Sequence, residues 1–303
     1  MRPRLYAGDC RKWLAEFAEQ GIQFDAVVTD PPYNIESIVK RFGKPSYKAA
    51  GFGEDGVFER SSERFVGQTW DASTIAQDSS FWTLVLNVMK PGAYLFAFGF
   101  SRTIHRQTVA IEEAGFIIHP QRVWHNRQGM PKPHPVDKAM LRSNDPDVQA
   151  QASAWKGWAY GAQSYRPALE PIAFAQKPFS EKNGPLNIIR HGVGAVNIDA
   201  VRGPNGEYPT NYVDEVFEAP KANARDRAGS KHPSVKPIAL IQDLCRASTP
   251  PGGTILDPFA GSGTTGEAAQ LEGFQSYLIE QDRTFRDDIM RRFGNRAHRL
   301  RRK

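Results

Sequence analysis

The 303-residue sequence predicts an α/β fold in which a mixed, mostly parallel sheet is covered by helices. Short apolar runs alternate with longer amphipathic runs, which is typical of parallel strands joined by crossover helices. Near the C-terminus, a glycine-rich turn follows one apolar run and opens an amphipathic one, as in nucleotide-binding folds. No internal repeat is visible, which argues against a solenoid or a propeller.

The first half of the chain supplies the predicted strands and helices of one part of the sheet. We expect strands at 24–29, 93–98 and 116–124, and helices at 79–89 and 104–114. The first helix has apolar residues at helical spacing, and Pro91-Gly92 is expected to end it. Gly115 is expected to stop the second helix.

The remaining elements lie mostly near the C-terminus. We expect a strand at 171–175, a helix at 238–245, a strand at 254–256, a helix at 265–271 and a strand at 276–279. Two stretches break the alternation. Residues 36–71 are predicted to form a mobile loop, since long loops in compact domains usually serve as lids or binding segments or are disordered.

The second irregular stretch, residues 126–229, is dense in Pro, Gly, Asn and basic residues, and we interpret it as an insertion that carries a recognition surface. The predicted organisation is therefore a catalytic half at 1–125, an insertion at 126–229 containing one core strand, and a cofactor-binding half at 230–303. Aromatic and basic side chains interleave from Arg122 to Arg166, which suits either a DNA-reading surface or a half-buried insertion.

Composition narrows the classes of protein. The net charge of +6 favours a polyanionic partner, and residues 291–303 contain seven Lys or Arg, which suits a phosphate-contacting arm or a solvated tail. Two cysteines, Cys10 and Cys245, do not make a disulfide framework and fit a reducing cytoplasm. No apolar run is long enough to cross a membrane, and the seven histidines lack the spacing of a metal site.

The first chemical motif runs from Asp257 to Gly266 and reads DPFAGSGTTG. Its glycines fit G-x-G-x-x-G, in which a tight turn lets a cofactor approach bare backbone at a helix N-terminus. Glu280 ends the next predicted strand, where its carboxylate could accept hydrogen bonds from ribose hydroxyls. A nicotinamide dinucleotide would suit this motif as well as another adenosine-bearing cofactor, and a glycine-rich packing turn is a further alternative.

The second motif, Asp30-Pro31-Pro32-Tyr33, follows the predicted strand 24–29 directly. Two prolines fix the backbone and remove two amide donors, so that carbonyl groups stay available as acceptors. A carboxylate before them and an aromatic ring after them suit the exocyclic amine of a nucleobase lifted out of its helix. A simple Pro-Pro turn competes with this interpretation only if the first motif is ignored.

Together these motifs resemble the S-adenosylmethionine-dependent amino-group DNA methyltransferases, in the permuted order of their β class. Asp30-Pro31-Pro32-Tyr33, followed by Asn34-Ile35, precedes the glycine-rich motif along the chain. Further segments that are similar to members of the family, including phage and prophage ones, are 5–10, 170–178, 197–199 and 232–237. The resemblance covers both ends of the chain and is loose in the middle.

The resemblance implies a Rossmann-like methyltransferase fold with a seven-stranded sheet and an inserted target-recognition region. It also implies that Phe259 packs on the adenine of S-adenosylmethionine, that Gly261 and Gly263 line the methionine portion, and that Glu280 binds the ribose. Asp9 would bind the adenine amine, and Ser234 and Lys236 the carboxylate end. The further expected members of the cofactor site are Cys10, Asp30, Asp257, Ser262 and Thr264.

The expected reaction is methyl transfer to adenine N6 of a flipped base in double-stranded DNA. Asp30 and the Pro31 carbonyl would accept hydrogen bonds from the amine, Pro32 would fix the turn, and Tyr33 would stack on the base. This reaction needs no covalent intermediate with the enzyme. The cysteines agree, because attack at cytosine carbon 5 needs a thiolate in a Pro-Cys pair and neither Cys10 nor Cys245 lies in one. Trp70-Asp71 resembles a position near the entering base, or else is a buried Trp beside a helix cap.

Three alternatives stay open. Cytosine N4 is the second candidate target, although N4 members of the family more often carry Ser at the position of Asp30. A nicotinamide-dependent oxidoreductase would leave Asp30-Pro31-Pro32-Tyr33 without a role, and a catalytically idle DNA-binding protein would have kept both motifs intact without using them. A homodimer and a partner restriction nuclease are compatible with the sequence, which does not reveal the DNA sequence recognised.

Overall fold

The computed structural model describes residues 2–33, 73–125, 133–161, 164–203, 205–214, 222–232, 234–294 and 298–300. The predicted loop 36–71 and the pair Trp70-Asp71 lie outside the described residues. The chain forms two compact units, one from Met1–Trp124 with Glu170–Lys303 and the other from His125–Leu169. The candidate motifs all belong to the first unit.

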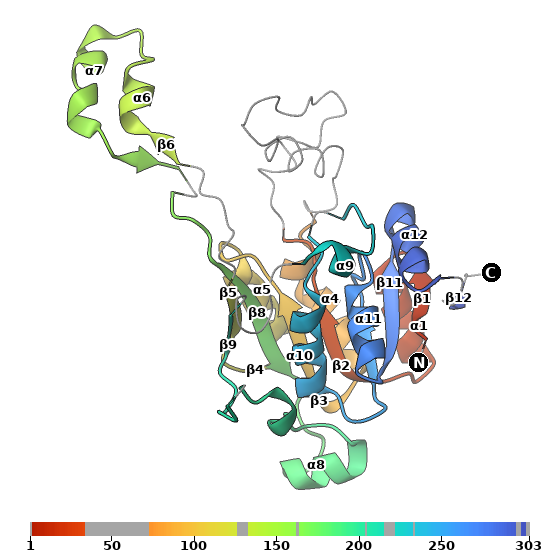
Figure 1. Ribbon diagram of the computed structural model, residues 1–303. Coiled ribbons are helices and arrows are strands. Elements are labelled where there is room, and N and C mark those ends of the chain that lie inside the picture. Colours follow the sequence, from red (N-terminus) through yellow and green to blue (C-terminus); the bar gives the residue numbers. More distant parts are fainter. Residues whose placement is uncertain are drawn as a thin grey trace. The chain divides into compact units, whose positions relative to one another are not determined.

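The first unit is built on one sheet with the strand order β12-β1-β11-β10-β2-β3-β8-β5-β9, and β4 pairs with β8 beside this path (Figure 1). Its strands are β1 (Arg4–Ala7), β2 (Phe24–Thr29), β3 (Met89–Phe98), β4 (Ile117–Ile118), β5 (Arg122–His125), β8 (Leu169–Gln176), β9 (Tyr212–Asp214), β10 (Thr254–Asp257), β11 (Gln275–Glu280) and β12 (His298–Leu300). From β12 to β3 every neighbouring pair is parallel, whereas β8 runs antiparallel to β3.

Helices cover both faces of the sheet, as the alternation of apolar runs predicts (Figure 1). On one face lie α1 (Cys10–Glu19), α4 (Ser79–Asn87) and α5 (Ile104–Glu113); on the other lie α10 (Ile238–Ser248), α11 (Thr264–Leu271) and α12 (Arg283–Arg292). Alternate residues of β2 divide between the two cores: Val27 packs with the first set of helices, and Ala26 and Val28 with the second. This period of two is what a strand buried on both faces requires.

The predicted α/β class is confirmed, and most predicted elements lie within a few residues of their observed bounds. The sheet has ten strands in the described part of the chain rather than the expected seven, because the short strands β4, β9 and β12 are added to it. The single strand expected at 116–124 is wrong: β4 and β5 replace it, with Pro120 between them. Proline has no N–H to donate to a neighbouring strand, so the ladder is interrupted there.

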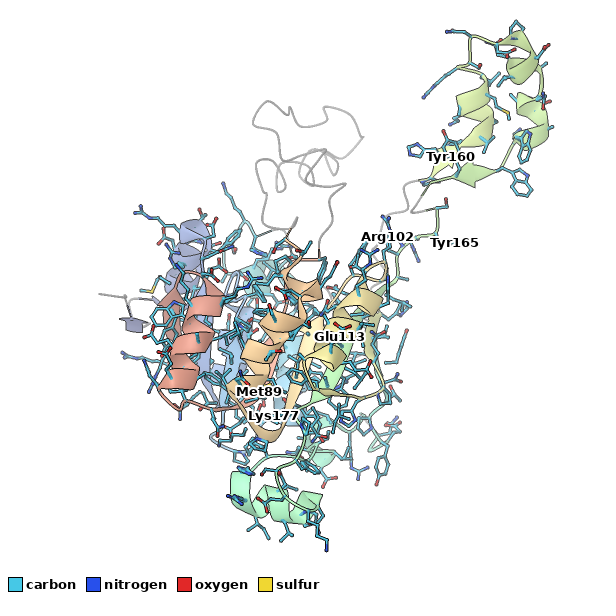
Figure 2. The ribbon with its side chains drawn as sticks, turned by 180° about the vertical axis from the view of Figure 1, so that it is seen from behind. Met89, Arg102, Glu113, Tyr160, Tyr165 and Lys177 are labelled. Atoms are coloured by element: carbon cyan, nitrogen blue, oxygen red, sulfur yellow. The ribbon has the colours of Figure 1, made fainter. Side chains whose placement is uncertain are left out.

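The prediction that Pro91-Gly92 ends a helix is also wrong. The helix α4 ends earlier, at Asn87, and Pro91-Gly92 lies inside β3, where the register against β2 shifts. Gly92 has φ +86°, a left-handed conformation that suits such an irregularity. Figure 2 shows Lys177 beside Met89; its Nζ donates to the Met89 and Leu86 carbonyls, each at 2.8 Å, and so ties the end of β8 to the junction of α4 and β3.

The second unit contains a small two-stranded sheet and short helices. The strands β6 (His134–Pro135) and β7 (Ala159–Tyr160) are antiparallel, with His134 opposite Tyr160. Between them lie α6 (Val136–Met140), α7 (Pro146–Ala150) and the 3-10 helix η3 (Ala152–Trp155). The rings of Trp155 and Trp158 lie 5.5 Å apart, edge to face, and both side chains are exposed.

The other elements of the first unit are short. They are the helices α8 (Gly184–His191) and α9 (Ala224–Arg227) and the 3-10 helices η2 (Ile75–Gln77) and η4 (Asp199–Val201). Within the basic C-terminal segment, His298–Leu300 form strand β12, which pairs in parallel with β1. No helix in the described ranges is long and apolar enough to span a lipid bilayer.

Candidate active site

The two sequence motifs meet at one edge of the sheet. Strands β2 and β10 are adjacent and parallel, with Val27 opposite Leu256. Thr29, the last residue of β2, donates from Oγ1 to Oδ1 of Asp257, the last residue of β10, at 2.7 Å. The Asp30 motif therefore begins beside the glycine-rich turn. The carboxyl ends of parallel strands are where ligands bind in folds of this type.

The glycine-rich turn is shaped by two glycines with positive φ. Gly261 has φ +50° and Gly263, which precedes α11, has φ +83°. A side chain would strain the backbone at either position, and a Cβ on Gly261 would lie 3.2 Å from the ring of His232. Asp257 Oδ1 accepts a hydrogen bond from the Phe259 amide at 3.1 Å, which fixes the start of the turn.

Three other predicted residues of the turn are also in place. Ser262 and Thr264 are buried, and their hydroxyl oxygens are 3.2 Å apart. The ring of Phe259 lies 5.3 Å from that of Phe81 on α4 and is only partly buried. Because one side of the ring packs on the core and part stays accessible, Phe259 can still contact a planar ligand.

Glu280, the last residue of β11, holds the turn from the neighbouring strand. Its Oε2 accepts from the Gly261 amide at 2.8 Å and its Oε1 from the Asp282 amide at 2.7 Å. Burial raises the pKa of Glu280 to about 7 even though these amides favour the carboxylate. Burial likewise raises the pKa of Asp257 to about 6, against hydrogen bonds from Thr265 and Thr29.

Asp9 and Cys10 lie where β1 passes into α1. Asp9 caps this helix, because its Oδ1 accepts from the Arg11 amide at 2.9 Å, and its side chain is exposed. The preceding Gly8 donates from its amide to the Glu280 carbonyl at 3.1 Å, so Asp9 follows a residue that is bonded to the tip of β11. Cys10 is buried and burial raises its pKa to about 12, so this thiol stays protonated and inert. Burial also raises the pKa of Cys245.

Asp30 and Tyr33 belong to a cluster of four interacting polar side chains. Tyr33 donates from Oη to Asp30 Oδ1 at 2.5 Å, and the same Oη lies 2.7 Å from Glu170 Oε1. Lys236 Nζ is 3.0 Å from Asp30 Oδ2, donates to Tyr33 Oη at 2.9 Å, and forms an ion pair with Glu170. Pro31 is buried and Pro32 is half-buried. The motif is therefore held from two directions, by β8 and by the segment before α10.

The electrostatics of this cluster follow from its burial. Burial raises the pKa of Asp30, Lys236 opposes the rise, and Glu170 adds to it. Burial, followed by the charges of Asp30 and Glu170, raises the pKa of Tyr33 well above its ordinary value of 10.0. Burial alone would lower the pKa of Lys236, but the two carboxylates outweigh it and the pKa is raised. At neutral pH, Lys236 is therefore an ammonium and Tyr33 a neutral hydroxyl.

Ser234 and Lys236 follow a buried histidine. The Ser234 amide donates to His232 Nδ1 at 3.3 Å, and the ring of His232 lies 4.3 Å from that of Phe285. Burial, reinforced by the charges of Lys236 and Arg227, lowers the pKa of His232 to about 3. This imidazole is therefore neutral, and it packs against the glycine-rich turn at Gly261.

The sequence pattern gives Glu170 and His232 no role, and it places Arg292 only in the basic C-terminal tail. Arg292 has a nearly fully buried side chain, donates from Nε to the Ser262 carbonyl at 2.8 Å, and pairs with Glu267. The helix α12 thereby braces the glycine-rich turn. The predicted residues fall into two groups, one around Glu280 and one around Asp30, and the Thr29–Asp257 hydrogen bond joins them.

Comparison with known proteins identifies relatives of this chain. The model of the N6/N4 "DNA methylase" family matches residues 24–291. A curated relative, the Type II methyltransferase M.HindIII of Haemophilus influenzae, is 30% identical over 186 residues. This match includes 60% of the present chain and 57% of M.HindIII, so the chain spans little more than half of that relative.

Solved structures share the fold. The complex of M1.HpyAVI with SAM has a TM-score of 0.57 at 18% identity, covering 96% of this chain and 98% of that one. The PvuII DNA methyltransferase, described as cytosine-N4-specific, has a TM-score of 0.56 at 16% identity, covering 98% and 89% of the two chains. At sequence identities of 16–18%, these comparisons show that the fold is shared.

Proposed function

Because the chain belongs to the N6/N4 DNA methylase family, we propose that it transfers a methyl group from S-adenosylmethionine to adenine N6 in double-stranded DNA. One observation carries the proposal most directly: Asp30 and Tyr33, at the tip of β2, lie beside the glycine-rich turn at the tip of β10, and Thr29 is hydrogen-bonded to Asp257 across the two strands. An acceptor amine at the first tip and a methyl donor at the second would thus be neighbours.

The residues of the turn fit such a cofactor. Gly261 and Gly263 leave bare backbone at the start of α11, where a ligand can approach closely. Each carboxylate oxygen of Glu280 accepts one amide hydrogen bond and keeps a further lone pair for a ribose hydroxyl. Phe259 offers a partly accessible ring, which suits an adenine.

The other proposed cofactor contacts surround these. Ser234 would lie at the carboxylate end of the cofactor. Lys236 would contribute only its charge there, because its three N–H donors face Asp30, Tyr33 and Glu170. Asp9 would accept from the adenine amine. Cys10, Asp30, Asp257, Ser262 and Thr264 complete the proposed site by shaping the turn and its walls. When bound, S-adenosylmethionine supplies an electrophilic methyl group on a sulfonium.

The Asp30 motif would prepare the target amine for attack. Hydrogen bonds from its two protons to Asp30 and to the Pro31 carbonyl draw the nitrogen toward a tetrahedral shape and localise its lone pair. Tyr33 would stack on the extruded base, which contributes about 1–3 kcal/mol in comparable contacts. Pro32 would fix the turn that places these groups.

Recognition of DNA is assigned to the predicted insertion at 126–229 and to the basic residues after Arg292. The unit formed by His125–Leu169 overlaps the first part of the insertion and exposes Trp155, Trp158 and Tyr160. Exposed aromatic rings among basic residues suit contact with bases and phosphates. A homodimer and a role in restriction-modification stay predictions.

The test is to incubate the protein with duplex DNA and methyl-labelled cofactor, and then to digest the DNA to nucleosides. Label in N6-methyl-2′-deoxyadenosine supports the proposal. Label in N4-methyl-2′-deoxycytidine supports the second candidate, cytosine N4, which the family also includes. An unlabelled digest would favour a catalytically idle DNA-binding protein. Membership of the family favours a DNA methyltransferase, acting on either base, over the nicotinamide-dependent oxidoreductase.

A further inference from the structure

The cluster at the tip of β2 contains one carboxylate, that of Glu170, that is not needed to bind the target amine. Asp30 and the Pro31 carbonyl account for both protons of an exocyclic amine, yet Glu170 Oε1 lies 2.7 Å from Tyr33 Oη. Glu170 reaches this place because β8 is antiparallel to β3, with Ile172 opposite Phe98. The start of β8 therefore lies at the same edge of the sheet as the end of β3.

The hydroxyl of Tyr33 bridges two carboxylates. Its oxygen is 2.5 Å from Asp30 Oδ1 and 2.7 Å from Glu170 Oε1. A phenol has one proton and can donate it to one of these oxygens at a time. Both separations are those of strong hydrogen bonds between an O–H group and a carboxylate. A proton that arrives on Asp30 can therefore displace the Tyr33 proton onto Glu170.

Lys236 cannot take this role. Its three N–H donors face Asp30 Oδ2, Tyr33 Oη and Glu170 Oε1, and the two carboxylates raise its pKa, so that it is already protonated. Its charge instead helps to keep two carboxylates together in a largely buried space. Glu170 keeps 20% of its side-chain surface exposed, which gives water access to it.

Methyl transfer to an amine creates a proton that must leave. When the nitrogen lone pair forms the bond to the methyl carbon, the carbon–sulfur bond breaks and its electron pair stays on sulfur, which becomes neutral. Positive charge develops on the nitrogen as this bond forms, and loss of one N–H proton in the same step gives the neutral methylamine product. The base stacked on Tyr33 and bonded to Asp30 would cover Asp30 itself, so a route onward from Asp30 is useful.

We propose that Glu170 is the terminal proton acceptor of the reaction and is reached through the Tyr33 hydroxyl. In this sequence the N–H bond of the amine breaks as the methyl group is transferred, its electrons stay on nitrogen, and the proton binds an oxygen of Asp30. Asp30 then passes a proton to Tyr33 Oη as Tyr33 passes its own to Glu170 Oε1. Asp30 and Tyr33 are restored, and Glu170 releases the proton to water. The inference rests on the proposed function.

The test compares wild-type protein with Glu170→Gln, Glu170→Asp and Tyr33→Phe in single-turnover methylation of duplex DNA. Glu170→Gln keeps the size and an acceptor oxygen but cannot take up the proton, and it should slow the step by roughly 10²-fold, as loss of a proton-transfer group does. Glu170→Asp restores a carboxylate and should recover part of the rate. Glu181 forms an ion pair with Arg190 and is not part of the cluster, so the methylation rate of Glu181→Gln should match that of wild type.

Two measurements separate a relay from a purely structural role. In mixtures of H₂O and D₂O, the wild-type rate should curve with deuterium fraction, because two protons move, and the curve should become linear in Glu170→Gln. Tyr33→Phe keeps the ring and should lower the methylation rate as much as Glu170→Gln does. The double variant should be no slower than either single variant, since both substitutions interrupt the same series of proton transfers.

The cofactor-free protein offers an independent check. Because the Glu170 charge raises the pKa of Tyr33, Glu170→Gln should lower that pKa in an ultraviolet titration read as the difference from Tyr33→Phe. A wild-type rate insensitive to deuterium, a Glu170→Gln rate equal to wild type, or costs that multiply in the double variant would each overturn the relay. If wild-type protein transfers no label to DNA, the proposed function fails first, and the Tyr33 titration still reports on the cluster.

Discussion

Replacing Glu280 by Gln should remove a large part of the pH dependence of folding stability. The carboxyl group is buried at the end of β11, with 7% of the residue exposed, and its pKa is raised from 4.5 to about 7. The folded protein therefore binds this proton more tightly than the unfolded chain does. The contribution of Glu280 to the free energy of unfolding is therefore largest below pH 4.5, and it falls as the pH rises from 4.5 toward 7.

The size of the effect follows from the same values. One pKa unit corresponds to about 1.4 kcal/mol, so ionisation of Glu280 lowers the free energy of unfolding by about 3 kcal/mol between these two pH values. Glutamine does not ionise. Its amide donates toward one of the two backbone amides that Glu280 accepts from, so its absolute stability is less informative than its slope with pH.

The assay is urea unfolding of the cofactor-free protein at several values between pH 5 and pH 8. The wild-type free energy of unfolding should decline more steeply than that of Glu280→Gln, and the difference between the curves should change by about 3 kcal/mol. Glu113→Gln, on the exposed surface of α5 (Figure 2), is the matched control and should run parallel to wild type. Parallel curves for wild type and Glu280→Gln would refute the argument that burial controls this carboxyl group.

Three other predictions follow from the site and its packing. Asp30→Ala should abolish methyl transfer while cofactor affinity, measured by calorimetry, stays near that of wild type; a collapse of affinity would show that Asp30 belongs chiefly to the cofactor site. Gly266→Ala should destabilise the protein by about 1–3 kcal/mol in urea unfolding, since overpacking costs this much and the added Cβ would lie 2.7 Å from Leu278, whereas Gly184→Ala meets only ordinary contacts and should be close to neutral. Replacing the basic residues at 301–303 by Gln should flatten the dependence of DNA affinity on salt, by up to about 0.9 in the logarithmic slope for each phosphate that the tail would otherwise neutralise; an unchanged slope would assign these residues to solvent.

The central strands and the two motifs could be predicted from sequence because local signals define them. The strand 24–29 is a largely apolar run, and its predicted bounds are the observed ones. The turn from Asp257 to Thr264 needs glycines at fixed positions, and two of them have the positive φ that this requires. Local chemistry of this kind is visible without knowledge of the remaining chain.

The partners of Asp30 could not be predicted in the same way. Glu170 enters the cluster through the antiparallel register of β8 on β3, and neither the direction nor the register of a buried strand is encoded in its own apolar pattern. Lys236 belongs to a motif that the sequence reveals, yet its contact with Glu170 joins segments 66 residues apart. Arg292 has only the appearance of a tail residue in the sequence, since charge alone does not reveal whether a helix end is buried.

The position of the second unit along the chain has a consequence for how specificity could change. His125–Leu169 leaves the sheet after β5 and returns at β8, and these two strands are neighbours in it. An insertion between adjacent strands can be lengthened, shortened or exchanged while the hydrogen bonds of the sheet persist. On the proposed function, a related protein could therefore acquire a new DNA-recognition segment by exchange of one contiguous stretch of its gene, and the residues at the strand tips would be inherited unchanged.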